Sequence, residues 1–123
     1  MKKIVFLFAL AAIMLSAFQV KKRMKLAPIP AAIQKLISRF KAEEVQNPPR
    51  SVYSYTYHSK TVYYVPAICC DFFSDLYDNK GLIIGHPDGG FTGKGDGKTA
   101  DFSETRTNGK LIWKDNRGKQ ATP

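Results

Sequence analysis

The sequence has few of the residues from which metal and redox sites are usually built. Its 123 residues include two histidines, His58 and His86, and two cysteines, Cys69 and Cys70, which are adjacent. A zinc site needs several such ligands, and neighbouring side chains on an extended strand point in opposite directions. The composition therefore argues against a zinc-dependent enzyme.

The chain also lacks the short motifs of nucleotide-binding sites and serine hydrolases. Its glycine-rich stretch fits neither the phosphate-loop pattern nor the dinucleotide fingerprint, because both require a helix directly after the loop. No serine nucleophile motif stands beside a histidine, and no segment repeats at a fixed period. The sequence thus shows no catalytic constellation that its residues alone support.

Acidic residues are outnumbered, but the excess of positive charge is unevenly distributed. The chain has 19 Lys and Arg against 10 Asp and Glu, a net charge of +9. Six of the cationic residues lie near the N-terminus: Lys2, Lys3, Lys21, Lys22, Arg23 and Lys25. Without these six the net charge is +3, so we do not expect a nucleic-acid-binding surface.

Residues 1–17 resemble a secretory signal peptide. Two lysines precede an apolar run from Ile4 to Leu15, and the small residues Ser16 and Ala17 follow it. A lipoprotein signal would require cysteine where Phe18 stands, so no lipid anchor is expected. The prediction is export to a periplasmic or extracellular location.

A membrane anchor is the alternative for the same segment. Four cationic residues lie just beyond the apolar run: Lys21, Lys22, Arg23 and Lys25. Positive charge tends to remain on the cytoplasmic side, so an uncleaved Ile4–Val20 would hold the chain in the membrane. In either case we expect residues 18–28 to form a basic linker, 29–115 a single domain and 116–123 a flexible tail.

One helix is predicted before a series of strands. Pro30 suits a first helical position, and an apolar stripe at helical spacing follows: Ile33, Leu36, Ile37 and Phe40. The helix should run from Pro30 to about Ala42, because Asn47-Pro48-Pro49 prevents a longer one. We expect its stripe to pack on a sheet.

From Ser51 the pattern alternates with a period of two, which indicates strands. The predicted strands are Ser51–Tyr57, Thr61–Val65, Phe72–Tyr77, Leu82–Ile84, Thr105–Thr107 and Lys110–Lys114. Turn residues between them predict three hairpins, the last through Asn108-Gly109. The expected fold class is α+β, with the helix covering an antiparallel meander of about six short strands. Tyr53, Tyr55 and Tyr57 share one face, which we expect to lie under that helix.

The adjacent cysteines leave several states open. An extracellular location favours disulfides, but a bond between neighbours requires unusual geometry. Cys69 and Cys70 can be free thiols, a vicinal disulfide or links to another chain. The simplest expectation is a buried remnant of a lost disulfide pair, with both thiols free.

The segment Pro87–Lys98, here called the glycine loop, is the most unusual part of the chain, with five glycines among twelve residues. Its backbone N–H groups could hold an anion. The candidate ligand-binding residues are His86, Asp88, Gly89, Gly90, Lys94, Asp96 and Lys98. Alternatively, Asp88, Asp96 and Asp101 could bind Ca²⁺, the one cofactor considered. The plainest interpretation is a surface loop held in place by its aspartates.

Three longer stretches resemble a known family. They are YYVPAICCDFFSDLYD (63–78), PDGGFTGKGDG (87–97) and NGKLIWKD (108–115). The pattern is similar to that of small exported bacterial proteins that share a conserved domain of unknown function, here from about Ile29 to Asp115. The resemblance implies export, one compact domain and, in relatives, further cysteines near Gly85 and Thr99 that could pair with the double cysteine. This sequence has no cysteine at either position.

Together these features favour an exported, non-catalytic binding or structural module of the cell envelope. We expect a monomer that contacts an envelope protein or a glycan through the glycine loop and nearby aromatic residues. A small hydrolase using His86, Asp88 and Asp96 is one alternative. A Ca²⁺-binding extracellular domain is the other.

Overall fold

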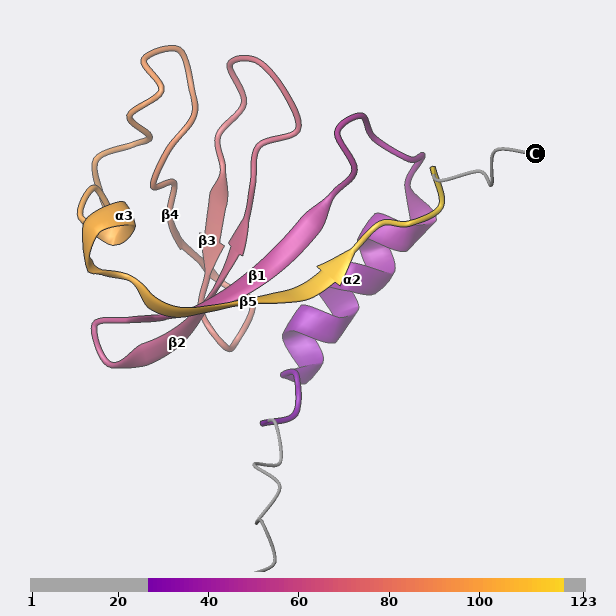
Figure 1. Cartoon of the computed structure of the whole chain (residues 1–123), viewed down its shortest axis with the longest axis horizontal. Coiled ribbons are helices and arrows are strands. Elements are labelled where there is room, and N and C mark those ends of the chain that lie inside the picture. The colour runs from indigo at the N-terminus through magenta and orange to yellow at the C-terminus, as the bar shows by residue number, and fades with distance from the viewer. Residues whose placement is uncertain (1–26, 119–123) are drawn as a thin grey trace, which may run out of the picture.

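The computed structural model describes residues 27–118, drawn in colour in Figure 1. The predicted signal peptide, most of the linker and the last five residues lie outside this range. Predictions about those segments therefore remain predictions. Within residues 27–118, no helix has the length and apolar character needed to cross a membrane.

The described residues form one antiparallel sheet with short helices, so the fold is mixed α and β. Its strands are β1 (Ser51–Tyr57), β2 (Lys60–Val65), β3 (Asp75–Tyr77), β4 (Ile83–Gly85) and β5 (Thr107–Lys114). The spatial order is β4-β3-β2-β1-β5. The first four strands follow a meander, but the chain then crosses the sheet and β5 pairs with the outer side of β1 (Figure 1). The prediction of about six strands was wrong by one.

The missing strand is explained by Asn108-Gly109, which forms no hairpin turn. Both residues lie inside β5, and Asn108 has a φ of 53°. The pairing with β1 shifts there by one residue, from Ser54↔Lys110 to Thr56↔Thr107. This is a β-bulge, which accepts the same left-handed backbone that a hairpin turn would need. The dipeptide therefore bends one strand instead of separating two.

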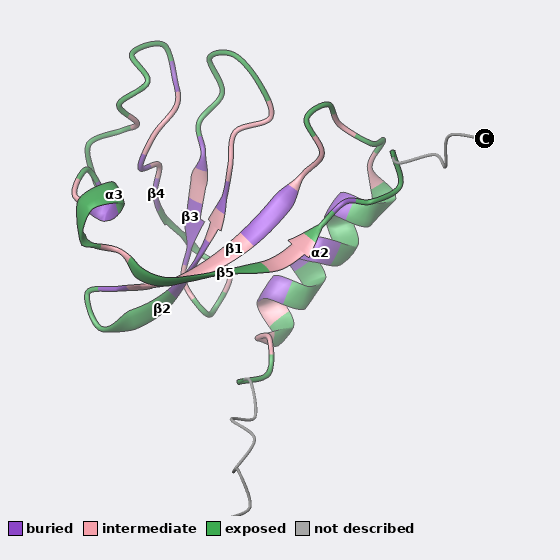
Figure 2. Cartoon of the chain, viewed as in Figure 1, coloured by how far each residue is buried: buried purple, intermediate pink, exposed green. Residues whose placement is uncertain are grey.

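Helix α2 (Ala31–Ala42) lies against one face of the sheet and forms the larger core. Its buried side chains are Ile33, Leu36, Ile37 and Phe40. They pack against Val52, Tyr63, Val65 and Tyr77 of the first three strands. In Figure 2 the buried residues of the helix face the sheet and its exposed residues face outward. Burial of this apolar stripe holds the helix in place.

The opposite face of the sheet has a second, smaller core. Its centre is Phe102, fully buried in the one-turn helix α3 (Phe102–Thr105). Tyr57, Val62 and Leu76 complete the buried cluster, and Tyr55 and Tyr64 pack against it. The expectation that the Tyr55 and Tyr57 face lies under α2 is therefore wrong. Alternation along β1 places those side chains opposite Val52, which is the residue that contacts α2.

Candidate functional site

Two long loops at one end of the sheet are joined by hydrogen bonds. One connects β2 to β3 (66–74) and the other, containing the glycine loop, connects β4 to α3 (86–101). The Gly90 N–H donates to the Phe72 carbonyl at 3.1 Å, and the Ser74 N–H donates to the Asp88 carbonyl at 3.1 Å. These loops lie side by side at the top of Figure 1. We call this end of the domain the loop end.

Asp88 anchors the glycine loop to the sheet. Its carboxylate accepts a hydrogen bond of 2.7 Å from the Tyr64 hydroxyl and a short one from Ser74 Oγ. Ser74 is 1% exposed, and its Oγ also accepts the Ala67 N–H at 2.9 Å. Burial, together with the neighbouring Asp88 carboxylate, raises the pKa of Tyr64 to about 12. Asp88 therefore has a structural role, and its oxygens already have partners.

The glycines let this loop fold back on itself. Gly95 has a φ of 70°, and a side chain there would overlap the His86 carbonyl. Gly89 has a φ of 83°, and a side chain there would overlap the Phe72 carbonyl. At these two positions only glycine combines a left-handed backbone with such close approach.

Most backbone N–H groups of the glycine loop donate within the protein. Gly89 donates to the Gly93 carbonyl, Gly93 to the Gly90 carbonyl and Gly95 to the Gly89 carbonyl. Asp96 donates to the His86 carbonyl. The predicted anion cradle would need these same groups, so the loop geometry does not favour it. Lys94 and Lys98 are exposed at its surface.

The three aspartates proposed for Ca²⁺ lie in separate surroundings. Asp88 is held by Ser74 and Tyr64, as described above. The Asp96 carboxylate accepts the Lys98 N–H at 3.0 Å, which lowers the pKa of that carboxyl group. Asp101, immediately before α3, is bonded to Tyr57 and His58. Among residues 27–118 no group of three His, Cys, Asp or Glu side chains is arranged to hold a metal ion. The predicted three-aspartate site is therefore not assembled.

Asp101 joins the β1–β2 turn to α3. Its carboxylate accepts hydrogen bonds from the Tyr57 hydroxyl at 2.6 Å and from His58 Nε2 at 2.7 Å. These bonds lower the pKa of Asp101, the Tyr57 bond most strongly. Burial and the bond to Asp101 raise the pKa of Tyr57 to about 12. The His58 ring also stacks on Tyr57, with ring centroids 3.9 Å apart. The positions of the histidines and aspartates in the sequence did not indicate that Tyr57, His58 and Asp101 lie together.

His86 pairs with an aspartate that the sequence did not indicate. Its Nδ1 lies 2.9 Å from Asp75 Oδ1 and 3.2 Å from the Ser74 carbonyl. Its ring stacks on Phe73 with a centroid distance of 5.0 Å. The hydrolase hypothesis assigned this role to Asp88 and Asp96, which are bonded elsewhere. In FSDLYD (73–78) the neighbours Ser74 and Asp75 point to opposite faces of the strand. This alternation is the signal that could have indicated Asp75 as a partner of His86.

The double cysteine is exposed and oxidised. Cys69 and Cys70 are joined to each other by a disulfide, and the residues 27–118 contain no free cysteine. Both side chains lie at the surface, in the turn that precedes Phe72. The expectation of a buried remnant with free thiols is wrong. The turn makes the vicinal bond feasible, because Cys70 has a left-handed φ of 57° and the backbone there is not extended.

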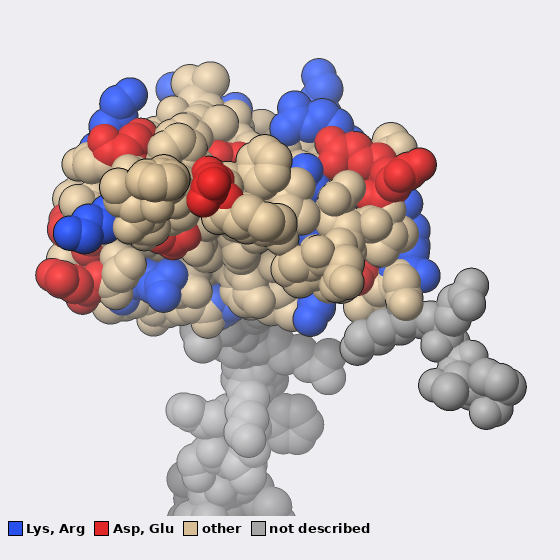
Figure 3. Space-filling model, turned by 90° about the horizontal axis from the view of Figure 1, so that it is seen from above, with Lys and Arg blue, Asp and Glu red and all other residues tan. Residues whose placement is uncertain are grey.

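Three exposed phenylalanines occur on the two joined loops. Phe72 is 62% exposed, Phe73 is 45% exposed and Phe91 is 92% exposed. Figure 3 views the domain from the loop end, where residues other than Lys, Arg, Asp and Glu cover much of the surface. We call Phe72, Phe73 and Phe91 the aromatic end. The tyrosines of β1 and β2 do not form this surface, because Tyr55, Tyr57 and Tyr64 pack around Phe102.

The cysteines implied for relatives near Gly85 and Thr99 would also be placed differently from expectation. A side chain built on Gly85 would have its Cβ 3.2 Å from Thr99 Cβ. The two positions are thus adjacent, and cysteines there would be placed to pair with each other.

The family comparison covers the sheet and the loop end. Residues 38–115 match a family model described as a domain of unknown function (DUF6970). The match begins within α2, at Ser38 and not near Ile29, and ends just after β5. No curated protein and no solved structure matches the chain. Because the match covers more than half of the sequence, the chain belongs to the family defined by this domain of unknown function, DUF6970.

Proposed function

We propose that this protein is an exported, non-catalytic binding module that contacts an envelope protein through its aromatic end. The observation that carries the proposal is the exposure of Phe72, Phe73 and Phe91 on two hydrogen-bonded loops. Large apolar side chains gathered at one surface of a small domain are typical of interaction sites. The hydrogen bonds between the two loops hold the rings in place before a partner binds, which reduces the conformational entropy lost on binding.

The occupied polar groups nearby support a binding role over catalysis. Asp88 accepts bonds from Ser74 and Tyr64, and the nearly buried Ser74 hydroxyl is a donor to that carboxylate. His86 Nδ1 is directed to Asp75. A histidine-assisted nucleophile would need a hydroxyl or thiol within reach of the other ring nitrogen. The hydroxyl of Ser74, whose backbone carbonyl lies beside His86, already donates to Asp88.

Two features support an exported location. Residues 1–17 have the order of charge, apolar run and small residues that signal peptides share. The Cys69–Cys70 disulfide is exposed to solvent, and an exposed disulfide would be reduced in the cytoplasm. An oxidising compartment outside the cytoplasm therefore suits it. The resemblance to small exported bacterial proteins agrees with this location. We place the domain in the periplasm or outside the cell, and an uncleaved anchor at Ile4–Val20 is the other arrangement to be tested.

A protein surface suits the aromatic end better than a glycan does. Sugars are usually recognised by an aromatic ring together with side chains that hydrogen-bond to their hydroxyl groups. At the loop end the nearby polar side chains Ser74, Asp88 and His86 already bond within the domain. The rings themselves are phenylalanines, which have no hydroxyl. An apolar protein surface needs no such partners.

Site-specific photocrosslinking in the native cell tests both the location and the surface. A benzophenone amino acid is placed at position 91, at the aromatic end, and separately at position 111 on β5. Leu111 is a matched control because it is apolar, is 54% exposed and lies on β5, the edge strand at the other end of the order from β4. We expect a discrete crosslinked species from position 91 only, recovered from the envelope or periplasmic fraction.

A second set of variants identifies the role of the aromatic rings. Phe72→Ser combined with Phe91→Ser should abolish a crosslink formed from a neighbouring exposed position, Thr92, while Leu111→Ser should preserve it. Equal crosslinking from positions 91 and 111, or an unaffected crosslink in the double variant, would contradict the proposed surface. Recovery of the precursor, with residues 1–17 intact, in the cytosol would contradict export.

A further inference from the structure

The edge strand β4 leaves apolar side chains exposed at the border of the sheet. It is the outermost strand in the order β4-β3-β2-β1-β5, so within the described residues its outer side has no strand partner. Three consecutive apolar residues are exposed there: Leu82 is 62% exposed, Ile83 50% and Ile84 36%. An edge of this kind accepts further strands readily, and proteins usually protect it.

The opposite edge, β5, has the usual protection. Its pairing with β1 shifts register at two places, so the strand is bulged twice. It also has lysines at positions 110 and 114. Bulges and lysines both discourage the addition of another strand. β4 is short and its pairing with β3 also shifts register once, but it contains no lysine and the side chains of Ile83 and Ile84 are exposed. This difference from β5 suggests that β4 binds a partner.

A groove lies on each face of the sheet beside β4. On the α2 side a groove of ≈ 660 Å³ has an apolar wall that includes Leu36, Tyr77 and Ile83. On the α3 side a groove of ≈ 560 Å³ has an apolar wall of Tyr57, Val62 and Ile84. Successive side chains of a strand point to opposite faces. A strand added beside β4 would therefore place alternate side chains over the two grooves.

The charged residues that line these grooves are mostly cations. The α2-side groove has Lys35, Arg39 and Lys80 in its lining and no Asp or Glu. The α3-side groove has Lys60 and His58, together with Asp78. The Asp78 carboxylate already accepts the N–H groups of Lys80 at 2.9 Å and Leu82 at 3.0 Å, within its own turn. The grooves thus present positive charge to an occupant.

We propose that β4 binds an extended, acidic segment of a partner protein as a sixth strand of the sheet. Backbone hydrogen bonds to β4 would supply sequence-independent affinity, as in other cases of strand addition. Acidic side chains at every second position would meet Lys35, Arg39 and Lys80, and the alternate side chains would lie over Ile84 and Val62. This surface is separate from the aromatic end, so the inference does not depend on the proposed function.

Charge argues against a second copy of the chain as the occupant. Pairing two β4 strands would bring the cations at both grooves of one copy toward those of the other. Like charges at close range disfavour association of two copies. An acidic segment gains from the same cations.

The test measures binding of synthetic peptides to the intact protein. The first probe is an eight-residue peptide of alternating Glu and Val, labelled with a fluorophore for anisotropy. The second replaces Glu with Lys, and the third has N-methyl groups on alternate backbone nitrogens, which blocks strand pairing. We expect the Glu-Val peptide to bind at least about tenfold more tightly than either of the others, a difference of about 1.4 kcal/mol. Amide chemical shifts at residues 82–85 should change on binding.

Variants of exposed residues identify the grooves without disturbing the core. Lys35→Glu combined with Arg39→Glu should weaken binding of the Glu-Val peptide by about tenfold or more. The matched control, Lys110→Glu combined with Lys114→Glu on β5, should leave it unchanged. Both pairs reverse the same number of exposed charges.

Four results would overturn the inference. Equal affinity for the Glu-Val and Lys-Val peptides would show that the cations do not select acidic side chains. Unaltered binding of the N-methylated peptide would show that the peptide does not pair with β4 through its backbone. Binding to phosphatidylglycerol vesicles that is lost in the Lys35→Glu, Arg39→Glu variant, with no peptide binding, would assign the cations to a membrane surface. A dimer that disappears on substitution of Ile83 by Lys would assign the edge to a second copy.

Discussion

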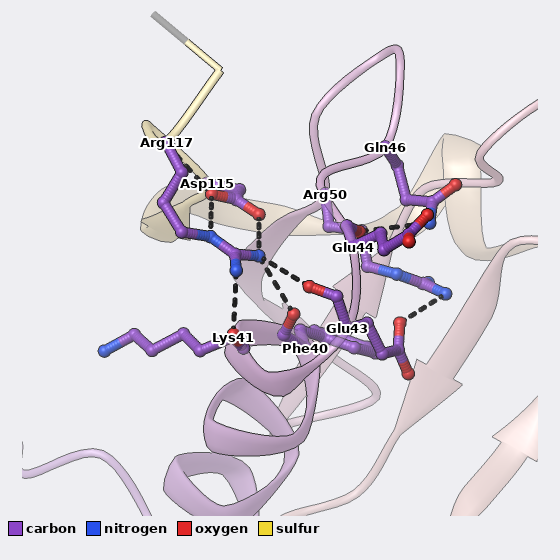
Figure 4. A network of polar contacts seen from close by, with 8 residues as sticks. All are labelled: Phe40, Lys41, Glu43, Glu44, Gln46, Arg50, Asp115 and Arg117. Carbon is purple, nitrogen blue, oxygen red and sulfur yellow. Dashed lines mark hydrogen bonds and ion pairs between the residues drawn. The ribbon is translucent and has the colours of Figure 1, made fainter.

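The guanidinium group of Arg117 donates two hydrogen bonds to the carboxylate of Asp115, of 3.0 Å from Nε and 2.7 Å from Nη2 (Figure 4). The same guanidinium donates to backbone carbonyls at the end of α2, including that of Lys41 at 2.8 Å. A helix ends with carbonyls that have no partner within the helix, and Arg117 satisfies several of them. The segment after β5 therefore fastens α2 to the sheet.

Removal of this clamp should destabilise the domain. Arg117→Ala removes the guanidinium bonds to the α2 carbonyls and leaves the buried Asp115 carboxylate with only the backbone N–H of residue 117, so the melting temperature should fall. Arg117→Lys should recover little, because an ammonium group cannot form the two parallel bonds of a guanidinium. The neighbouring exposed change Lys114→Ala is the control. Thermal unfolding followed by circular dichroism measures all three, and equal melting temperatures for Arg117→Ala and wild type would contradict the clamp.

The Asp101 carboxylate should make the stability of the domain depend on pH in the acidic range. Hydrogen bonds from Tyr57 and His58 lower the pKa of its carboxyl group in the folded protein. Its contribution to stability is therefore complete above the unfolded-state pKa of about 3.9 and is lost as the pH falls through the lower folded-state value. Asp101→Asn should flatten the fall of stability below about pH 4, whereas the exposed change Asp71→Asn should not. Urea unfolding between neutral pH and pH 2 measures the difference, and parallel curves for Asp101→Asn and wild type would exclude this role.

Phe102 should be essential to the second core, whereas Phe91 should not affect stability. Phe102 is fully buried, and the rings of Tyr55 and Tyr57 contact it edge-on at 5.5 Å and 5.4 Å between centroids. Phe102→Ala should lower the free energy of unfolding by about 3–5 kcal/mol. Phe91→Ala, at a side chain that is 92% exposed, should change it by less than about 0.5 kcal/mol. Chemical unfolding of both variants checks this contrast, and similar values for the two would argue against a core centred on Phe102.

A disulfide between positions 85 and 99 should form and stabilise the domain. The Cβ of a residue at position 85 would lie 3.2 Å from Thr99 Cβ, and disulfides need about 3.5–4.5 Å, so a small shift suffices. Thr99 Oγ1 is buried and has no hydrogen-bond partner among residues 27–118, so its replacement removes no bond within that range. Gly85→Cys with Thr99→Cys should add about 3 kcal/mol under oxidising conditions. Peptide mapping under non-reducing conditions identifies the bond. The gain should vanish with a reductant; pairing of either new cysteine with Cys69 or Cys70 would refute the proposed contact.

Some of the fold could be read from local pattern. The stripe Ile33, Leu36, Ile37 and Phe40 is the buried side of α2, and the alternation from Ser51 gives β1 and β2. These elements repeat their signal over two or more turns or several alternations. The prediction of a third hairpin was wrong because Asn108-Gly109 specifies a left-handed backbone and not the path of the chain around it. A bulge and a turn use the same local conformation.

The candidate site was less accessible to sequence reasoning. The glycine loop was singled out correctly as unusual, but its aspartates were grouped by spacing along the chain. In the folded protein Asp88, Asp96 and Asp101 bond to partners on different elements, and His86 pairs with Asp75 from β3. Glycines that could have served a ligand instead allow the loop to pack against its own neighbours.

The sequence by itself determined the local elements of this protein: the helix, the alternating strands, and the glycines at positions of left-handed backbone. Those features depend on residues a few positions apart, so neighbouring side chains and backbone sterics decide them. Only the tertiary structure decided that β5 crosses to β1, that the tyrosines pack around Phe102 and that Phe72, Phe73 and Phe91 are left exposed. These outcomes depend on which distant surfaces meet, and many pairings satisfy the same local pattern until the whole chain is packed.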